Sequence, residues 1–422
     1  MNDDTVLLQG SPVNWKKNLL VIWLSQFLAM VGFGCCMPFI PLLLKEKLHV
    51  DDDSIRGLYV SIYYLAAMVS LCVATSVWGM LADRFGRKLM LLRASYAAAI
   101  FYPLLALAPN FWVLVTIRFV CSFFSGTVNP AQTLLISTTP NEKHGFVLGV
   151  LSTATSAGNM LGYLLGGLIV HYYGYTEAFF TCGGIYLASA LLVHIFAKED
   201  FNVKLTKKMR SKSPYKFKDV ATPAVIWLLV LFLILGVSSR LVQPYMAMLV
   251  EKVHHEFKEA AFYTGIASAA ASLGGFFSGI LIGWLCDRMA PRKLLVPLLL
   301  FGGAITLAMA LSFNIQMLIV SRFFAALATG GIHPVLQLVL TKITKPELRG
   351  TYFGWSGSLS TAGGIICSFL GGGIAYFSGV RGVYIVSACM LFIMLPMLIP
   401  TFAAMRKEYV VDPDATAKDL KQ

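Results

Sequence analysis

Long apolar runs alternate with short polar segments along most of the chain. We count twelve runs of 20 or more predominantly apolar residues, and each is long enough to cross a hydrocarbon core of about 30 Å. A large soluble helical protein would need polar helix faces, which these runs lack. The pattern therefore predicts an all-α membrane protein with twelve transmembrane helices, centred near residues 31, 68, 98, 124, 159, 187, 235, 272, 301, 328, 364 and 392.

The charged residues predict how the spans are oriented. The net charge of +13 is compatible with a nucleic-acid partner, but its distribution argues against one. With both termini on the cytoplasmic side, 24 of the 34 Lys and Arg lie on that side, 6 lie on the other side and 4 lie within spans. Cytoplasmic loops are enriched in Lys and Arg. We therefore expect a multi-pass protein of the cell (inner) membrane, with both termini in the cytoplasm and no nucleic-acid partner.

A charged hairpin occurs twice, which indicates an internal duplication. Residues 79–88 read GMLADRFGRK and residues 283–293 read GWLCDRMAPRK, with the first glycines 204 residues apart. At the same offset, RFVCSFFSGTVNPAQ from Arg118 matches RFFAALATGGIHPVL from Arg322. An ordered series of matches at half the chain length is typical of transporters built from repeated bundles. The spans should form two pseudo-symmetric six-helix bundles.

The stretch between the two halves is basic and contains no apolar run long enough to span a membrane. Lys198 to Lys218 contains eight basic residues. The expected organisation is an N-terminal cytoplasmic tail at 1–17, a six-helix bundle at 18–198, a basic cytoplasmic linker at 199–221, a second six-helix bundle at 222–405 and a C-terminal cytoplasmic tail at 406–422.

These motifs resemble the major facilitator superfamily over nearly the whole chain. GMLADRFGRKLMLL matches the loop 2–3 motif of that family, and GNMLGYLLGG at 158–167 resembles the motif of its drug:proton antiporter branch. The opening NWKKNLLVIWLSQF is most similar to multidrug exporters of the branch. The resemblance implies two bundles that rock about a central site and expose it alternately to each side. It also implies efflux of hydrophobic or amphipathic small molecules, with the proton gradient as energy source and no other cofactor.

The repeated hairpin is the candidate gate. The resemblance implies that Asp83 holds the two halves together on the cytoplasmic side, and glycine permits the tight turn. A solvated basic turn would explain the Lys and Arg equally well, but it leaves Asp83 unexplained. The gating candidates are Gly79, Asp83, Arg84, Gly86, Arg87, Lys88, Asp287 and Arg288.

Glycines on span 5 form a candidate packing motif. Gly158, Gly162 and Gly166 lie four residues apart on one helix face, next to Gly167. Small residues let helices approach closely in lipid. Tyr163 stands where the antiporter motif has proline, so ordinary helix packing stays open as the alternative.

Polar residues on spans 4 and 10 are the candidates for proton coupling. An arginine within a span costs about 2.5–3.5 kcal/mol on insertion scales, so Arg118 should face protein or a wet cavity. The resemblance gives Arg118 a part in proton coupling, whereas the alternative is an arginine that binds backbone carbonyls. His333 can change charge near neutral pH, or it can be structural. The candidates are Asp83, Arg118 and His333.

The two halves differ at their expected cavity positions. Span 7 carries Arg240 and Gln243 on one face, where span 1 has Gly34 and Met37. We therefore expect a cavity that is apolar in the N-terminal half and polar-basic in the C-terminal half. The cavity candidates are Gln26, Met37, Asn129, Arg240, Gln243, Tyr245, His333 and Gln337.

No acidic residue falls in the middle of a predicted span. Of the 21 Asp and Glu, the most nearly buried are expected to be Asp83, Asp287 and Glu177. Export of a cationic drug usually needs an intramembrane carboxylate. We therefore expect neutral or anionic amphiphiles as substrates.

Other functions remain as alternatives. Arg240 would suit an exchanger or importer of one anionic metabolite, such as an organophosphate, and an apolar chain would also suit a lipid flippase. An enzyme is not indicated, because the sequence has no nucleophile–base motif, no HExxH and no phosphate loop. The expected partners are a small-molecule substrate, protons and membrane lipids, with the chain acting as a monomer and holding no metal.

Overall fold

The computed structural model describes residues 14–199, 222–286, 288–344 and 349–409, and every regular element within them is a helix. Ten helical segments there are long and apolar enough to cross a membrane. The all-helical membrane class is thus confirmed, whereas the count of twelve stays a prediction. The segment Tyr352–Ala403 counts once although Gly379 interrupts it with non-helical angles, and the glycine-rich span 5 is not among the ten.

The chain divides into two compact units whose boundary is interleaved along the sequence. The first unit comprises Met1–Leu43 and Ala66–Ser211, and the second comprises Leu44–Leu65 and Lys212–Gln422. Residues 44–65, which the repeat places in the N-terminal half, thus cluster with the C-terminal half. The predicted linker and both predicted tails lie almost entirely outside the described residues.

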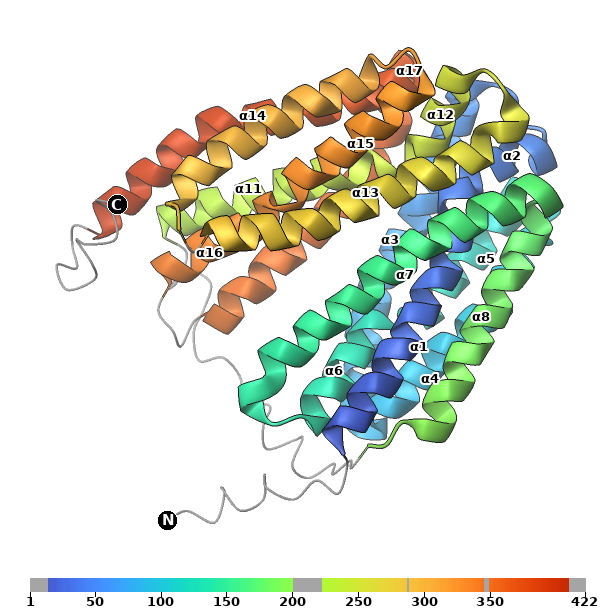
Figure 1. Cartoon of the computed structure of the whole chain (residues 1–422), viewed down its shortest axis with the longest axis horizontal. Helices are drawn as coiled ribbons and strands as arrows, with labels where there is room; N and C mark the ends of the chain where they lie inside the picture. Colours follow the sequence, from blue (N-terminus) through green and yellow to red (C-terminus); the bar gives the residue numbers. More distant parts are fainter. Residues whose placement is uncertain (1–13, 200–221, 287, 345–348, 410–422) are drawn as a thin grey trace. The chain divides into compact units, whose positions relative to one another are not determined.

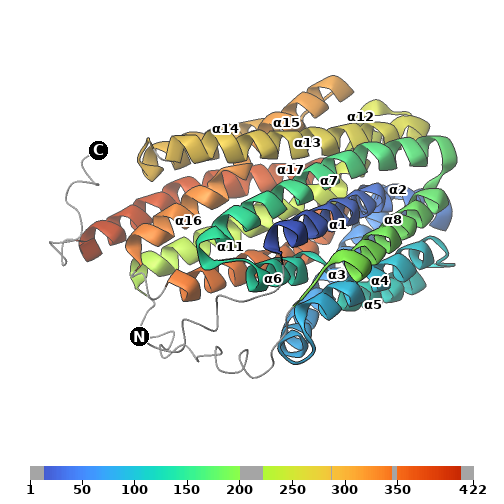
Figure 2. The same cartoon turned by 60° about the horizontal axis from the view of Figure 1, so that its bottom comes forward.

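In the first unit, α1 packs along α7 and α8, and α4 packs along α8 (Figures 1 and 2). Buried apolar side chains such as Ile22, Leu91 and Leu151 join these helices in one core. The helices are α1 (Trp15–Cys36), η2 (Met37–Phe39), α3 (Asp53–Phe85, from residue 66 on), α4 (Arg87–Ala106), α5 (Phe111–Phe124), α6 (Val128–Thr138), η3 (Asn141–Lys143), α7 (His144–Tyr173) and α8 (Tyr175–Phe196).

In the second unit, α11 packs along α17, and α13 packs along α15. Buried residues such as Phe232, Leu295 and Leu336 form its core. The helices are α2 (Ile40–Leu48, from residue 44 on), the first part of α3, α11 (Pro223–Leu241), η4 (Gln243–Tyr245), α12 (Met246–His254), α13 (Phe257–Cys286), α14 (Pro291–Ala310), α15 (Ile315–Gly330), α16 (Ile332–Ile343) and α17 (Arg349–Tyr409).

The sequence duplication is repeated in local structure. Asn110 caps α5 by accepting from the amide of Val113 at 3.0 Å, and Asn314, 204 residues later, caps α15 by accepting from Met317 at 2.7 Å. A side-chain oxygen at this position satisfies an amide that the helix itself leaves unpaired. The two units therefore start their equivalent spans 4 and 10 with the same device.

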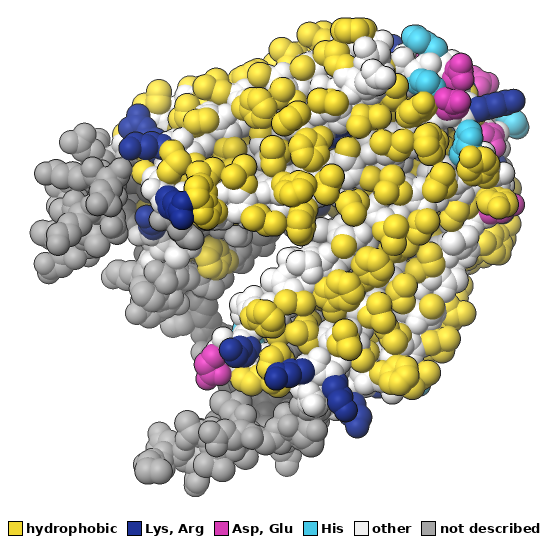
Figure 3. Space-filling view, in the orientation of Figure 1, with side chains coloured by type: hydrophobic (Ala, Val, Ile, Leu, Met, Phe, Trp, Pro, Cys, Tyr) yellow, Lys and Arg dark blue, Asp and Glu magenta, His cyan; other side chains and the backbone are white. Residues whose placement is uncertain are grey.

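Hydrophobic side chains cover the flanks of the helices, whereas charged side chains gather at helix ends (Figure 3). Trp112, Ile280 and Phe377 are 65%, 60% and 85% exposed. In water such exposure would be costly, but hydrocarbon accepts it at no cost because lipid tails are equally apolar. The surface agrees with helices that cross a membrane.

Candidate functional site

A cavity of about 550 Å³ lies inside the first unit. Pockets that hold drug-sized molecules commonly measure about 300–1,000 Å³. The cavity is therefore large enough for one small molecule with an aromatic or alkyl body. Its apolar lining comes largely from Met30, Phe33, Met68, Leu71, Trp78, Met90, Tyr102 and Tyr186.

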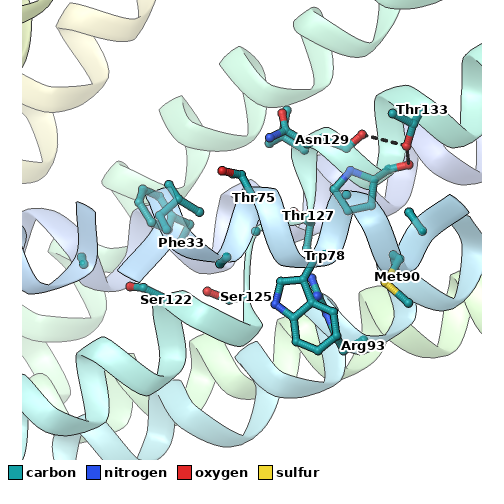
Figure 4. A pocket seen from close by; sticks show the side chains of 18 of the residues that line it. Phe33, Thr75, Trp78, Met90, Arg93, Ser122, Ser125, Thr127, Asn129 and Thr133 are labelled. Carbon is teal, nitrogen blue, oxygen red and sulfur yellow. Dashed lines mark hydrogen bonds between the residues drawn. The ribbon is translucent and has the colours of Figure 1, made fainter. Parts of the chain in front are cut away.

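A break in span 4 forms one wall of the cavity. Helix α5 ends at Phe124 and α6 begins at Val128. Between them Gly126 adopts a φ of +113°, a conformation that side-chain-bearing residues rarely adopt. The Thr127 hydroxyl donates to Oε1 of Gln26 at 3.1 Å, which ties the break to α1. Ser125 of the break and Asn129 of α6 line the cavity (Figure 4).

Arg118 lines the cavity from α5, one turn before Ser122. Its side chain lies almost out of contact with solvent, at 6% exposure. A guanidinium within a membrane span is costly unless it faces protein groups or a wet cavity. The predicted position of Arg118, on a face that borders a cavity, agrees with the structure.

Arg93 and Trp78 form a second polar wall. The Arg93 guanidinium lies 3.7 Å from the centre of the Trp78 ring (Figure 4). The indole N–H of Trp78 donates to the carbonyl of Phe123 at 2.7 Å. Nε and Nη1 of Arg93 are buried and have no hydrogen-bond partner among the described residues. A stacked guanidinium with donors to spare is well suited to an anionic or strongly polar ligand group.

The first copy of the charged hairpin reaches the cavity through Gly79 and Arg87. Gly86 adopts a φ of +94°, which permits the turn between α3 and α4. The amides of Arg87 and Lys88 donate to the Glu199 carboxylate at 2.8 and 2.7 Å. Glu199 thus places a negative charge at the N-terminus of α4, where the helix dipole favours it.

The gating role of this hairpin stays a prediction. The side chain of Asp83 and all of Asp287 lie outside the described part of the chain. Arg84 is exposed over the ring of Phe85, and Arg288 stacks on Trp284 at 3.8 Å.

The span 5 glycines lie against the backbone of α1. A Cβ on Gly158 would come within 2.5 Å of the carbonyl oxygen of Phe27, and one on Gly166 within 2.5 Å of Cα of Cys35. Gly162 is equally crowded. Gly167, the residue after Gly166, is also buried. Any larger residue would force α7 away from α1, so this motif packs helices.

Among the predicted cavity residues, Asn129 lines this cavity. Gln26 and Met37 are instead enclosed by protein, at 0% and 2% exposure. Tyr245 is also buried, and its hydroxyl donates to the carbonyl of Gly57 at 3.4 Å in the second unit.

The remaining candidates belong to the second unit. Arg240 is exposed, with its side chain near Gly364. Gln243 is exposed and Gln337 half-buried. The half-buried ring of His333 meets Phe232 edge to face, with the ring centres 5.3 Å apart.

The expectation of an apolar N-terminal half did not include the three arginines that line this largely apolar cavity, Arg87, Arg93 and Arg118. That expectation compared spans 1 and 7 alone, whereas the arginines come from α4 and α5. None of the described residues that line the cavity is Asp or Glu. The site is therefore basic and apolar together.

Sequence reasoning also missed a largely enclosed acid of the second unit, Glu251. Glu177, expected among the most nearly buried acids, is exposed. Glu251 instead is only 13% exposed and pairs with Lys45 and Arg56. Glu251 lies near the end of α12, which continues span 7. The sequence therefore placed it in a loop.

Comparison with known proteins identifies the family. The sequence model of the Major Facilitator Superfamily matches residues 22–315 and 245–419. The chain belongs to this superfamily. It is 30% identical over 379 residues to "Multidrug resistance protein MdtG" of Escherichia fergusonii, covering 90% of this chain and 93% of that protein. The MdtG of Salmonella typhimurium is also 30% identical, with 89% and 93% covered.

Solved structures of the superfamily share the fold. A bacterial homologue of the human lysosomal transporter Spinster, inward-facing and occupied, matches with a TM-score of 0.72 at 18% identity, covering 94% of this chain and 98% of that one. The nucleoside transporter NupG matches at 0.70 and 13% identity, with 93% and 99% covered. The human organic anion transporter MFSD10 matches at 0.61 and 15%, with 93% and 100% covered. The protein is thus a multi-pass membrane transporter of this superfamily.

Proposed function

We propose that this transporter exports neutral or anionic amphipathic small molecules from the cytoplasm, driven by the proton gradient and working by alternating access. The observation that carries the proposal is the cavity of about 550 Å³ in which three arginines face an aromatic and Met-rich wall. The likeness to MdtG multidrug resistance proteins supports export of varied compounds. Both termini would lie in the cytoplasm, and the chain would act as a monomer among membrane lipids.

The cavity suggests how a substrate would lie. An apolar body would pack against Phe33, Leu71 and Trp78, while a carboxylate or other polar end would face Arg93 and Arg118. Methionine and aromatic side chains accept ligands of varied shape, because they offer area without demanding one hydrogen-bond pattern. The arginines would disfavour a cationic ligand, since no described lining residue is acidic to offset them.

Asp83, Arg118 and His333 are the proposed residues for proton coupling. The proton gradient is the only energy source that we propose. Arg118 has the strongest support, because it borders the cavity at 6% exposure. A substrate anion and a charge-changing group could then compete for the same guanidinium, which would link the two fluxes.

A second candidate is an exchanger or importer of one anionic metabolite. The same three arginines favour it, since guanidinium groups bind carboxylates and phosphates in fixed geometry. Breadth of substrates separates the two functions. A metabolite carrier would accept one anion and closely similar molecules, whereas an exporter would accept unrelated amphiphiles.

Efflux from cells tests the proposal. In a strain lacking its own drug pumps, the protein should lower the accumulation of several unrelated fluorescent amphiphiles, and a protonophore should abolish the effect. Arg118→Ala, expressed at the same level in the membrane, should export no faster than cells without the protein. Equal accumulation with and without the wild-type protein for all dyes, or uptake of a single metabolite alone, would contradict the export function.

A further inference from the structure

Charged side chains of three helices meet at one end of the second unit. Glu251 of α12 forms ion pairs with Lys45 of α2 at 2.5 Å and with Arg56 of α3 at 2.9 Å. Arg56 also pairs with Asp53 one turn earlier on α3. The Arg56 side chain is only 1% exposed. Burying a guanidinium this deeply requires close counter-charges, and Glu251 and Asp53 supply them to Arg56.

These partners come from opposite halves of the sequence repeat. Residues 44–65 end span 1 and begin span 2 of the N-terminal half, yet they belong to the compact unit that contains residues 212–422. Helix α3 continues beyond this point and enters the first unit at Ala66. The Glu251 cluster therefore attaches a part of the N-terminal half to the C-terminal half.

A seam of small residues extends this attachment along α3 and α17. A Cβ on Gly57 would lie 2.6 Å from Cβ of Ala375, and the amide of Gly372 donates to Oγ of Ser61 at 3.1 Å. The Ser61 hydroxyl in turn donates to the carbonyl of Ser368. Backbones this close leave no room for larger side chains between α3 and α17, and Ser61 is enclosed while the seam is closed.

Three other charged or titratable residues of the second unit are engaged elsewhere or exposed. On the neighbouring turn, His254 contacts Glu259 at 2.8 Å, and Lys252 is exposed. On α17, Arg381 donates to the carbonyl of Ser312 at 3.0 Å. Within the described part of the chain, the ion pairs of Glu251 are those with Lys45 and Arg56.

We propose that Glu251 is a latch that holds the outer end of the transporter closed, and that outward opening requires its pairs with Lys45 and Arg56 to separate. The inference rests on the alternating-access part of the proposed function. In that cycle the outer ends of spans 1 and 2 must part from spans 7 and 11. Replacing the carboxylate by a neutral group removes the ion pair of Lys45 and leaves Arg56 with Asp53 as its counter-charge, which weakens the closed arrangement and shifts the population toward the open one.

Accessibility of the seam tests the latch without any substrate. Purified full-length Ser61→Cys protein in lipid nanodiscs is treated with a hydrophilic maleimide, and peptide-resolved mass spectrometry measures modification at residue 61 alone. Ser61 is 5% exposed in the closed seam. Adding Glu251→Gln should speed modification at least about fivefold, because the closed population falls. Glu251→Asp, which keeps the charge, should have a smaller effect.

A matched control is Glu259→Gln, which removes a carboxylate of the same end that pairs with His254 instead. It should leave modification of residue 61 unchanged. If Glu251→Gln does not fold, Lys45→Gln is the second variant. It removes the Lys45–Glu251 ion pair at the more exposed partner, and it should also speed modification of residue 61. Unchanged modification in a folded Glu251→Gln or Lys45→Gln protein would overturn the latch. The labelling experiment measures the accessibility of residue 61 and no transport. Failure of the latch would therefore appear in the labelling rates, whereas failure of the export function would appear in the dye assay.

Discussion

Spans 4 and 10 derive from one repeated sequence, but they build different surroundings. In span 4 the helix breaks between Phe124 and Val128, and its residues line a cavity. In span 10 only Gly331 separates α15 from α16, and a Cβ on the preceding Gly330 would come within 3.1 Å of Ser278. The same glycine position thus opens a cavity in one unit and packs two helices in the other.

This difference indicates that the two repeats share the start of the helix and the position of the arginine, whereas the surroundings of the arginine differ. Both spans begin with an asparagine cap and both carry an arginine two turns later. The arginine of span 4 is 6% exposed beside the cavity, whereas Arg322 of span 10 is half-buried and lies outside the cavity lining. We infer that substrate chemistry lies mainly with the first unit.

The largest expected effect comes from exchanging the two arginines for alanine. Arg118→Ala should lower proton-driven transport in proteoliposomes by about a hundredfold or more, because a charge-assisted contact with the ligand is lost. Arg322→Ala should lower it by about tenfold or less. Equal losses of transport in the two variants would contradict the difference between spans 4 and 10, since Arg118 and Arg322 would then contribute equally to transport. Initial rates with matched protein content provide the measurement.

A smaller effect should follow from alanine at Gly126, the glycine of the break, with Gly275 of α13 as an unhindered control. Gly126→Ala forces a side chain into a φ of +113°, which costs on the order of 1–2 kcal/mol. We therefore expect a lower thermal unfolding temperature and slower transport. Gly275→Ala has open space around its Cβ and should lose neither. A Gly126→Ala protein that matches wild type in both would show that the break does not need glycine.

The smallest effect should be a change in substrate preference at the stacked pair. Trp78→Leu removes the ring beneath Arg93, and a cation–π contact contributes about 0.5–2 kcal/mol. The apparent KM for an anionic dye should rise about threefold to tenfold, while that for a neutral dye of similar size changes less. Trp284→Leu breaks a comparable stack on Arg288 in the second unit. An equal shift from Trp284→Leu would remove the distinction between the units.

Much of this architecture was predictable from sequence, because membrane helices and repeats leave strong patterns. Hydropathy alone indicates the spans, and the Arg118 and Arg322 segments align at a constant offset. The gap in span 4 was not predictable, since it depends on the φ of Gly126 and on the contact between Thr127 and Gln26.

Tertiary contacts also explain the two residues that sequence reasoning undervalued. Arg93 was recognisable as an arginine within a span, but its stack on Trp78 joins two helices. Glu251 sits near the end of an apolar run, and only folding brings Lys45 and Arg56 to it. Lys45 and Glu251 lie 206 residues apart, so their ion pair leaves no local sequence pattern.

The most direct test of the central claim is a structure of the protein in lipid nanodiscs with a transported amphiphile bound. The account predicts ligand density within the first-unit cavity, with the apolar part against Trp78 and a polar or anionic end near Arg93 and Arg118. Density confined to Arg240, Gln243 and His333 in the second unit, with the first-unit cavity containing only water, would contradict it.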